Sequence, residues 1–225
     1  VTGIGNWSFL SGPNLPLIAD TTIPGTVIRS MIAGTYQFIW TISNGVCSAS
    51  NDTVQVIIFD LPTVSNAGSD QSVCNISSVS MSANAPITGS GNWSLVSGPN
   101  VPSITISTDP STSITGLIPG AYIFSWSVTS GVCAVSSDSM TVNVYDLPTV
   151  ANAGSDQNVC NVSSSVFSAN AAVIGNGQWA LISGPNVPSI AVPSNPVSPV
   201  SGLIQGAYLF TWTISAGICS ASIDT

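Results

Sequence analysis

The stretch Tyr122–Val128, with the sequence Tyr-Ile-Phe-Ser-Trp-Ser-Val, decides the fold class. Bulky residues alternate in it with Ile and Ser, and this period of two is typical of a half-buried β-strand. The same alternation returns at Tyr36–Ile42 and at Tyr208–Ile214. We therefore expect strands with an aromatic inner face, whose tryptophans belong to the core and not to a platform for a ligand.

The pattern returns because the chain repeats itself every 86 residues. The motif Gly5–Trp7 recurs as Gly91–Trp93 and as Gly177–Trp179. Residues 61–139 and 147–225 align without a gap and are identical at 44 of 79 positions. A fixed period of this length indicates an array of similar units that arose by duplication.

The Asp-Leu-Pro-Thr-Val motif at residues 60–64 and 146–150 marks the junctions between units, because a Pro soon after the end of an apolar strand interrupts it. We predict an incomplete repeat at 1–60 that lacks its start, a complete repeat at 61–146, and a repeat at 147–225 that lacks its last strand. The chain is then a window from a longer array. The alternative is a subunit whose incomplete ends are completed by strands from its neighbours.

Each unit holds several short strands that are separated by Gly, Pro and Asn turns. Beside the aromatic strand, the ranges Asn92–Val96, Ser103–Ser107 and Met140–Tyr145 are predicted strands. About six to eight strands in a unit of this size are typical of a β-sandwich. The predicted fold class is all-β, and the 20 Gly and 15 Pro of the chain disfavour long helices.

Charged residues are scarce: the chain has nine acidic residues, all of them Asp, one basic residue, Arg29, and no His. A net charge of −8 with a single Arg provides no basic groove, so we exclude nucleic acid as a partner. Without His, Lys or Glu, the ordinary bases that activate a serine are missing, and we expect no enzymatic activity. No apolar run approaches the roughly 20 residues of a membrane-spanning helix, so we expect no membrane insertion.

Five cysteines occupy two positions of the repeat, an early one at Cys74 and Cys160 and a late one at Cys47, Cys133 and Cys219. Early and late strands face each other across a sandwich core, so we predict the bridges Cys74–Cys133 and Cys160–Cys219, with the partner of Cys47 outside the chain. The rival pattern, Cys47–Cys74 and Cys133–Cys160, would link successive units across their junction. Either pattern favours an oxidising, extracellular compartment.

The opening Asn66–Cys74 resembles the start of PKD-like repeats, and the motifs Gly91–Trp93, Ser97–Pro99 and Gly116–Trp126 resemble the same family in giant surface adhesins of gliding and other Bacteroidota. The resemblance covers the whole chain. It implies tandem immunoglobulin-like sandwiches strung in long arrays and exported by the type IX pathway to the cell surface. The Trp-Asp-Phe-Gly-Asp-Gly stretch of the usual PKD pattern is absent, so no ligand-binding residue is carried over.

Four aspartates form a candidate metal site because they flank the junctions: Asp60, Asp70, Asp146 and Asp156. Their carboxylates could bind calcium, which takes about six to eight oxygen ligands. The competing interpretation is that they cap turns and keep an otherwise uncharged surface soluble. Apart from this calcium we predict no cofactor.

Thr53 and Ser139 are candidate glycosylation sites, since each follows an Asp and precedes an apolar residue. This arrangement resembles the O-glycosylation signal of Bacteroidota. The competing interpretation is that both residues simply open a strand.

These observations favour spacer repeats of a long extracellular filament or stalk of an adhesin, for attachment or gliding motility. The predicted partners are neighbouring repeats and, because uncharged strand edges pair readily, further copies assembled into fibres. Surface polysaccharide is another candidate partner. The alternative function is a carbohydrate-binding module that contacts glycans through exposed aromatics, for which Phe9, Phe59 and Tyr145 are the candidates.

Overall fold

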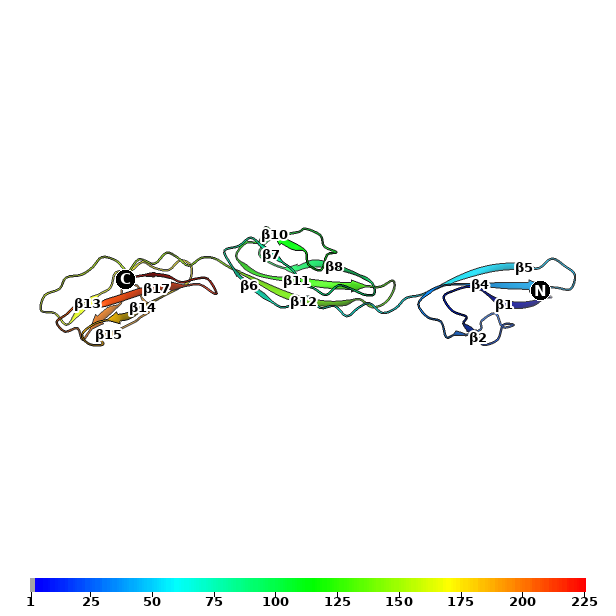
Figure 1. The fold of residues 1–225 in the computed structure, drawn as a ribbon, viewed down its shortest axis with the longest axis horizontal. Helices are drawn as coiled ribbons and strands as arrows, with labels where there is room; N and C mark the ends of the chain where they lie inside the picture. Colours follow the sequence, from blue (N-terminus) through cyan, green and yellow to red (C-terminus); the bar gives the residue numbers. More distant parts are fainter. Residues whose placement is uncertain (1–2) are drawn as a thin grey trace. The chain divides into compact units, whose positions relative to one another are not determined.

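The computed structural model describes residues 3–225, and this range contains strands, turns and loops but no helix (Figure 1). Residues 1 and 2, where the predicted repeat 1–60 begins, lie outside the described residues. The predicted all-β class is confirmed. The strands are β1 (Ile4–Ser11), β2 (Leu17–Ile18), β3 (Ile28–Arg29), β4 (Gly34–Ser43), β5 (Ser50–Ile58), β6 (Gln71–Cys74), β7 (Ser78–Ser80), β8 (Ser90–Ser97), β9 (Ser103–Ile104), β10 (Ser113–Thr115), β11 (Gly120–Thr129), β12 (Ser136–Tyr145), β13 (Ser164–Val166), β14 (Asn176–Ser183), β15 (Ser189–Ile190), β16 (Pro199–Ser201), β17 (Leu209–Ser215) and β18 (Ser222–Asp224).

The strand bounds follow the sequence period of 86 residues: β1, β8 and β14 occupy equivalent positions, as do β4, β11 and β17. The predicted strands at Tyr122–Val128, Asn92–Val96 and Met140–Tyr145 are confirmed by β11, β8 and β12. The predicted strand Ser103–Ser107 is shorter, because β9 ends at Ile104. We use "repeat" below for the three sequence units 1–60, 61–146 and 147–225.

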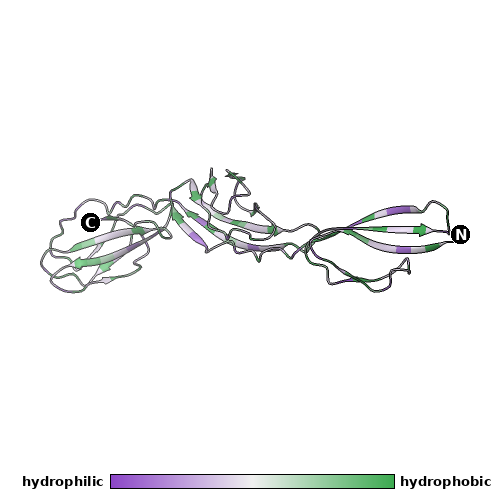
Figure 2. Cartoon of the chain, turned by 45° about the vertical axis from the view of Figure 1, so that its right-hand side comes forward, coloured by the Kyte–Doolittle hydropathy of each residue, from purple (hydrophilic) through white to green (hydrophobic). Residues whose placement is uncertain are grey.

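Residues of the second repeat form two sheets with a core of aromatic and branched side chains. One sheet has the order β6-β12-β11-β8, and the other has the order β7-β10-β9. The alternation in β11 buries Tyr122, Phe124, Trp126 and Val128 completely, as the sequence predicts. Trp93 of β8 lies against Trp126 with 5.3 Å between the ring centroids. Figure 2 shows pale and apolar residues over most of the strands, in keeping with the low charge of the chain.

The third and first repeats use the same layers with fewer paired strands. The sheets of the third repeat have the orders β14-β17-β18 and β13-β16-β15, and those of the first have the orders β1-β4-β5 and β2-β3. In the third repeat Trp179 and Trp212 form the core together with Ala151, Phe167 and Val200.

The described chain divides into two compact units by its internal contacts. One unit comprises residues 1–65, 85–91 and 127–137, and the other comprises 66–84, 92–126 and 138–225. This division differs from the predicted boundaries at residues 60 and 146, which stay a prediction.

The sequence Ser-Gly-Pro-Asn occurs at residues 11–14, 97–100 and 183–186, and each copy packs against the tyrosine of an aromatic strand to form what we call the tyrosine dock. A Cβ on Gly98 would lie 2.3 Å from the ring of Tyr122, so only glycine leaves room for the ring. The Tyr122 hydroxyl donates to Oδ1 of Asn100 and accepts from the backbone N–H of Ile118 at 2.9 Å. The equivalent bonds join Tyr36 to Asn14 and Tyr208 to Asn186.

The opening segment of the second repeat is residues 63–84, and its equivalent in the third repeat is residues 149–170. Its residues 65–74 lie along β12 and are held there by four sets of contacts. The Oγ of Ser65 donates to the carbonyl of Ser136 at 2.6 Å, and the backbone N–H of Ala67 donates to Oδ2 of Asp138 at 2.8 Å. The backbone N–H of Thr141 donates to Oδ1 of Asp70 at 2.7 Å. Strand β6 then pairs parallel with Val142–Tyr145.

The parallel pairing brings Cys74 to the far end of β12, where it forms a disulfide with Cys219. Cys74 is the register partner of Tyr145, the last residue of β12. Cys219 lies in the turn between β17 and β18, and its Sγ lies 3.2 Å from the carbonyl oxygen of Asp146. The Cα atoms of the two cysteines are 5.3 Å apart, within the range that a disulfide requires.

The predicted pairing Cys74–Cys133 and Cys160–Cys219 is therefore wrong. Cys133 precedes the start of β12, whereas Cys74 faces its end, and ten residues of strand span roughly 30 Å. The rival pattern is also not formed, because Cys47, Cys133 and Cys160 are free thiols. That Cys47 has its partner outside the chain stays a prediction.

Replacing Tyr122 by Phe tests the tyrosine dock. We expect the free energy of unfolding to fall by about 1–3 kcal/mol, because Asn100 Oδ1 and the Ile118 N–H lose their partner in a part-buried site. Urea denaturation followed by tryptophan fluorescence measures the change. Tyr145→Phe is the matched control, since the Tyr145 hydroxyl makes no hydrogen bond within residues 3–225. Equal losses in both variants would contradict this account of the motif.

Candidate functional site

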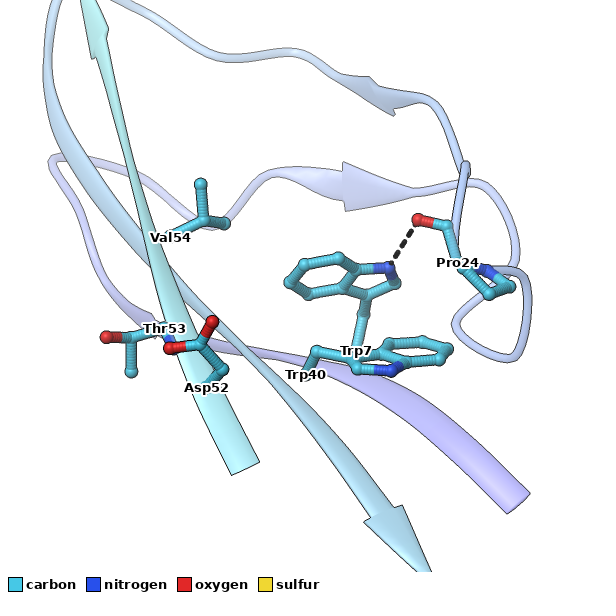
Figure 3. Close-up of a pocket in the computed structure, with 6 residues that line it drawn as sticks. All are labelled: Trp7, Pro24, Trp40, Asp52, Thr53 and Val54. Carbon is cyan, nitrogen blue, oxygen red and sulfur yellow. Dashed lines mark hydrogen bonds between the residues drawn. The ribbon is translucent and has the colours of Figure 1, made fainter. Parts of the chain in front are cut away.

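The first repeat carries an open groove beside its tryptophan pair, with a volume of about 200 Å³. Trp7 of β1 and Trp40 of β4 form its floor, and β5 contributes Asp52 and Val54 (Figure 3). The ring centroids of the two tryptophans are 5.1 Å apart. The indole N–H of Trp7 donates to the carbonyl of Pro24 at 3.1 Å, which fixes the ring.

The equivalent tryptophan pairs of the other two repeats are buried. Trp93 donates to the carbonyl of Pro110 and Trp179 donates to that of Pro196, at 3.3 Å and 3.2 Å. Trp93 and Trp179 are nevertheless only 1% and 4% exposed, whereas Trp7 is half-buried. The difference comes from the opening segments, which bring buried side chains such as Ala67 and Phe167 to these cores. The prediction that the tryptophans are core residues is thus confirmed for the second and third repeats and holds in part for the first.

The third repeat has a larger groove of about 570 Å³. Its wall is formed by Gln157, Phe167, Trp179 and Tyr208, and Thr225 lies at its rim. The groove of the first repeat is mainly apolar, whereas the lining of the third-repeat groove is polar and apolar in about equal parts. A mixed lining of this kind suits an extended peptide segment or a sugar ring.

The described residues do not gather the four aspartates of the predicted calcium site. Within residues 3–225 there is no group of three or more His, Cys, Asp or Glu side chains that could hold a metal ion. Asp70 instead accepts the backbone N–H of Thr141, and the carbonyl oxygen of Asp146 contacts Cys219. Asp60 and Asp156 make no side-chain hydrogen bond to the described residues. Calcium binding at these positions stays a prediction.

The two predicted glycosylation residues lie on strands with their side chains exposed. Thr53 is in β5 and Ser139 is in the equivalent place of β12. Figure 3 shows the Thr53 side chain pointing away from the tryptophan pair. Both hydroxyls are therefore accessible, as a glycosylation site requires, and the modification itself stays a prediction.

The aromatics proposed for the carbohydrate-binding alternative are already engaged. Phe59 covers Gly131, where a Cβ would lie 2.3 Å from its ring, and Tyr145 covers Gly217 in the same way at 2.1 Å. Phe9 packs against Phe38 with 5.9 Å between the ring centroids. None of the three presents a free ring face at the groove of the first repeat.

Asp20 shapes the turn that supplies the Pro24 carbonyl. The Thr22 hydroxyl and then the Thr22 backbone N–H donate to its carboxylate, and these bonds lower the pKa of Asp20 below its ordinary value. Because the folded pKa is lowered, the bonds stabilise the turn at neutral pH and are lost as the pH falls through that pKa. The carboxylate is fully exposed, so the effect is local to the turn.

Sequence reasoning missed the residues that close the cores. Asp138 and Asp224 accept the backbone N–H groups of Ala67 and Ala153, both at 2.8 Å. The signal that could have found them is their recurrence, since Asp52, Asp138 and Asp224 are spaced by 86 residues. Asp52 is the third member of this set, and within residues 3–225 its carboxylate accepts only the backbone N–H of its neighbour Thr53.

The described residues contain no helix that is long and apolar enough to cross a membrane.

Comparisons with known proteins agree with this architecture. Residues 67–144 match the family described as K319L-like, PKD domain. No curated protein matches the chain significantly.

Two solved structures share the fold. The I-band fragment I67–I69 from titin superposes with a TM-score of 0.52 at 9% identity, over 99% of this chain and 86% of the titin fragment. The Sidekick-1 immunoglobulin domains 1–4 superpose with a TM-score of 0.53 at 13% identity, over 99% of this chain and 66% of that one. At such identities the likeness shows the fold alone. Residues 67–144 thus resemble a PKD domain, and the chain has an immunoglobulin-like, all-β sandwich fold.

Proposed function

We propose that the chain consists of tandem spacer repeats in a long extracellular filament or stalk of an adhesin, which serves attachment or gliding motility. The observation that carries this proposal is that the same set of stabilising contacts occurs in all three repeats. The Tyr–Asn dock and the Trp–Pro hydrogen bond appear at the same positions in every repeat. A module whose conserved contacts all hold strands together is suited to bearing load and spacing.

The disulfide and the composition support the extracellular part of the proposal. Disulfides persist in oxidising compartments, and Cys74–Cys219 links residues 145 positions apart. PKD-like and immunoglobulin-like domains are typical of adhesion or structural proteins outside the cell. The resemblance to the surface adhesins of Bacteroidota supports the origin of the array and its location on the cell surface.

The proposal includes no enzymatic activity and two kinds of partner. Neighbouring repeats are the first, and copies assembled into fibres are the second, because strand edges without charge pair readily. Surface polysaccharide belongs to the alternative function, a carbohydrate-binding module, for which the open Trp7–Trp40 groove is the supporting observation.

Antibody labelling and glycan binding separate the two functions. For a spacer, antibodies against the chain label intact cells that express the protein, and the purified chain binds nothing above background on a glycan array. Labelling that requires permeabilised cells would contradict the extracellular location. Glycan binding that is lost in Trp7→Ala but kept in Trp93→Phe would establish the carbohydrate-binding alternative.

Calcium removal tests the junction aspartates. We expect a chelator to leave the melting temperature of the chain unchanged, because Asp70 is engaged by the Thr141 N–H and no acidic cluster surrounds it in residues 3–225. Differential scanning calorimetry with and without added calcium gives the comparison. A rise of several degrees with calcium that disappears in Asp146→Asn would show that the metal site exists.

A further inference from the structure

The outer edge of β5 matches the outer edge of β12 residue by residue, but nothing in the described chain lies along it. β5 is an edge strand in the order β1-β4-β5, whereas β12 has β6 beside it. Ser50 and Asp52 of β5 are the equivalents of Ser136 and Asp138, which anchor the opening segment of the second repeat. The polar anchors for such a segment are therefore present on β5 without the segment.

The apolar face of β5 is uncovered in the same way. Val54 is 42% exposed, whereas its equivalent Met140 is 1% exposed. Val56 is half-buried, and its equivalent Val142 is completely buried. The groove over Trp7 and Trp40 continues this face. The segment that would cover it must be extended and must bring small or apolar side chains, as Ala67, Val79 and Met81 do in the second repeat.

Cys133 marks the far end of this edge. Its Sγ lies 3.5 Å from the carbonyl oxygen of Asp60 and 3.9 Å from that of Phe59. Cys219, its equivalent, lies 3.2 Å and 3.9 Å from the carbonyl oxygens of Asp146 and Tyr145 and is bonded to the cysteine of the strand beside β12. Cys133 is thus in the position of a disulfide-forming residue, half-buried and without its partner.

We propose that the open edge of β5 and the Trp7–Trp40 groove bind the opening segment of another repeat of this kind, and that the cysteine of that segment forms a disulfide with Cys133. The segment lies parallel to β5 and has the pattern shared by residues 67–74 and 153–160, Ala-Gly-Ser-Asp-Gln-x-Val-Cys. Its alanine N–H donates to Asp52, and its cysteine reaches the level of Phe59. The proposal goes beyond the spacer function, because it assigns a ligand and a covalent bond to a defined surface.

The chemistry of the bond is ordinary. The two thiols lose two protons and two electrons to a disulfide-bearing oxidant, which is reduced to a dithiol, and one S–S bond forms. Cys133 would then be joined to an early cysteine, as Cys219 is joined to Cys74. The bond would link the second repeat covalently to the repeat that supplies the segment.

A synthetic peptide tests the proposal on the full chain. The peptide has the sequence of residues 63–84, with its cysteine activated as a mixed disulfide with 2-thiopyridine. The Cys133 thiolate attacks the peptide sulfur, the new S–S bond forms, and 2-thiopyridine leaves with the electrons of the broken bond and takes up a proton. The sites of modification are read by mass spectrometry of the digested product.

The solvent exposure of the three free cysteines alone predicts a different order of reaction from the one we expect. The other two cysteines therefore serve as internal controls for Cys133. Cys47 and Cys160 are exposed and Cys133 is only half-exposed, so an unbound reagent should modify Cys47 and Cys160 first. Binding along β5 raises the local concentration of the peptide, and we expect Cys133 to react at least about tenfold faster than either. A scrambled peptide with the same activated cysteine should lose this preference.

A pair of variants locates the binding surface. Asp52→Ala should reduce the rate at Cys133 severalfold, because it removes the acceptor for the peptide N–H. Asp109→Ala, a change at an exposed turn that belongs to the other compact unit, should leave the rate unchanged. Modification that follows exposure, or equal rates with the scrambled peptide, would overturn the proposal.

Discussion

The hydrogen bond from an opening segment to an aspartate of the last strand accompanies the burial of the tryptophan pair in a repeat. It is made from Ala67 to Asp138 and from Ala153 to Asp224, with the same length of 2.8 Å. Where it is made, the tryptophan pair beside it is buried, and where its equivalent at Asp52 is missing, Trp7 stays half exposed. Covering an indole pair removes a large apolar area from water, at about 25 cal/mol per Å². In a chain with 4% charged residues, such burial is the main source of stability.

The tyrosine dock is independent of this closure. Tyr36 and Phe38 are completely buried in the first repeat even though its groove is open. The dock joins Asn14, in the loop after β1, to Tyr36 of β4, the strand paired with β1, so it needs no residue from the opening segment. Each repeat therefore has one part of its core that forms locally and another part that depends on a segment laid along its last strand.

The features that depend on short-range periodicity, namely the strands and their buried faces, could be predicted from the sequence. The features that depend on the direction of strand pairing, such as the cysteine pairing, could not. The alternation in Tyr122–Val128 identified β11 and its buried face, because side chains of a strand alternate whatever their neighbours are. The cysteine pairing could not be derived in this way. Whether β6 runs parallel or antiparallel to β12 places Cys74 at one end of the sheet or the other, and no local pattern encodes that choice. The recurrence of Asp52, Asp138 and Asp224 is visible in the sequence, yet the role of Asp138 and Asp224 as acceptors for backbone N–H groups depends on the same long-range pairing.

The central claim, that an early cysteine meets the turn of the following repeat, is tested most directly by mapping the disulfide. Free thiols are alkylated without reduction, and the chain is cleaved on the N-terminal side of each Asp. The masses of the fragments are then measured by mass spectrometry. The account predicts that residues 70–108 are joined to residues 156–223 through Cys74 and Cys219, with Cys47, Cys133 and Cys160 alkylated. A bond between residues 70–108 and 109–137, which would join Cys74 to Cys133, would contradict it.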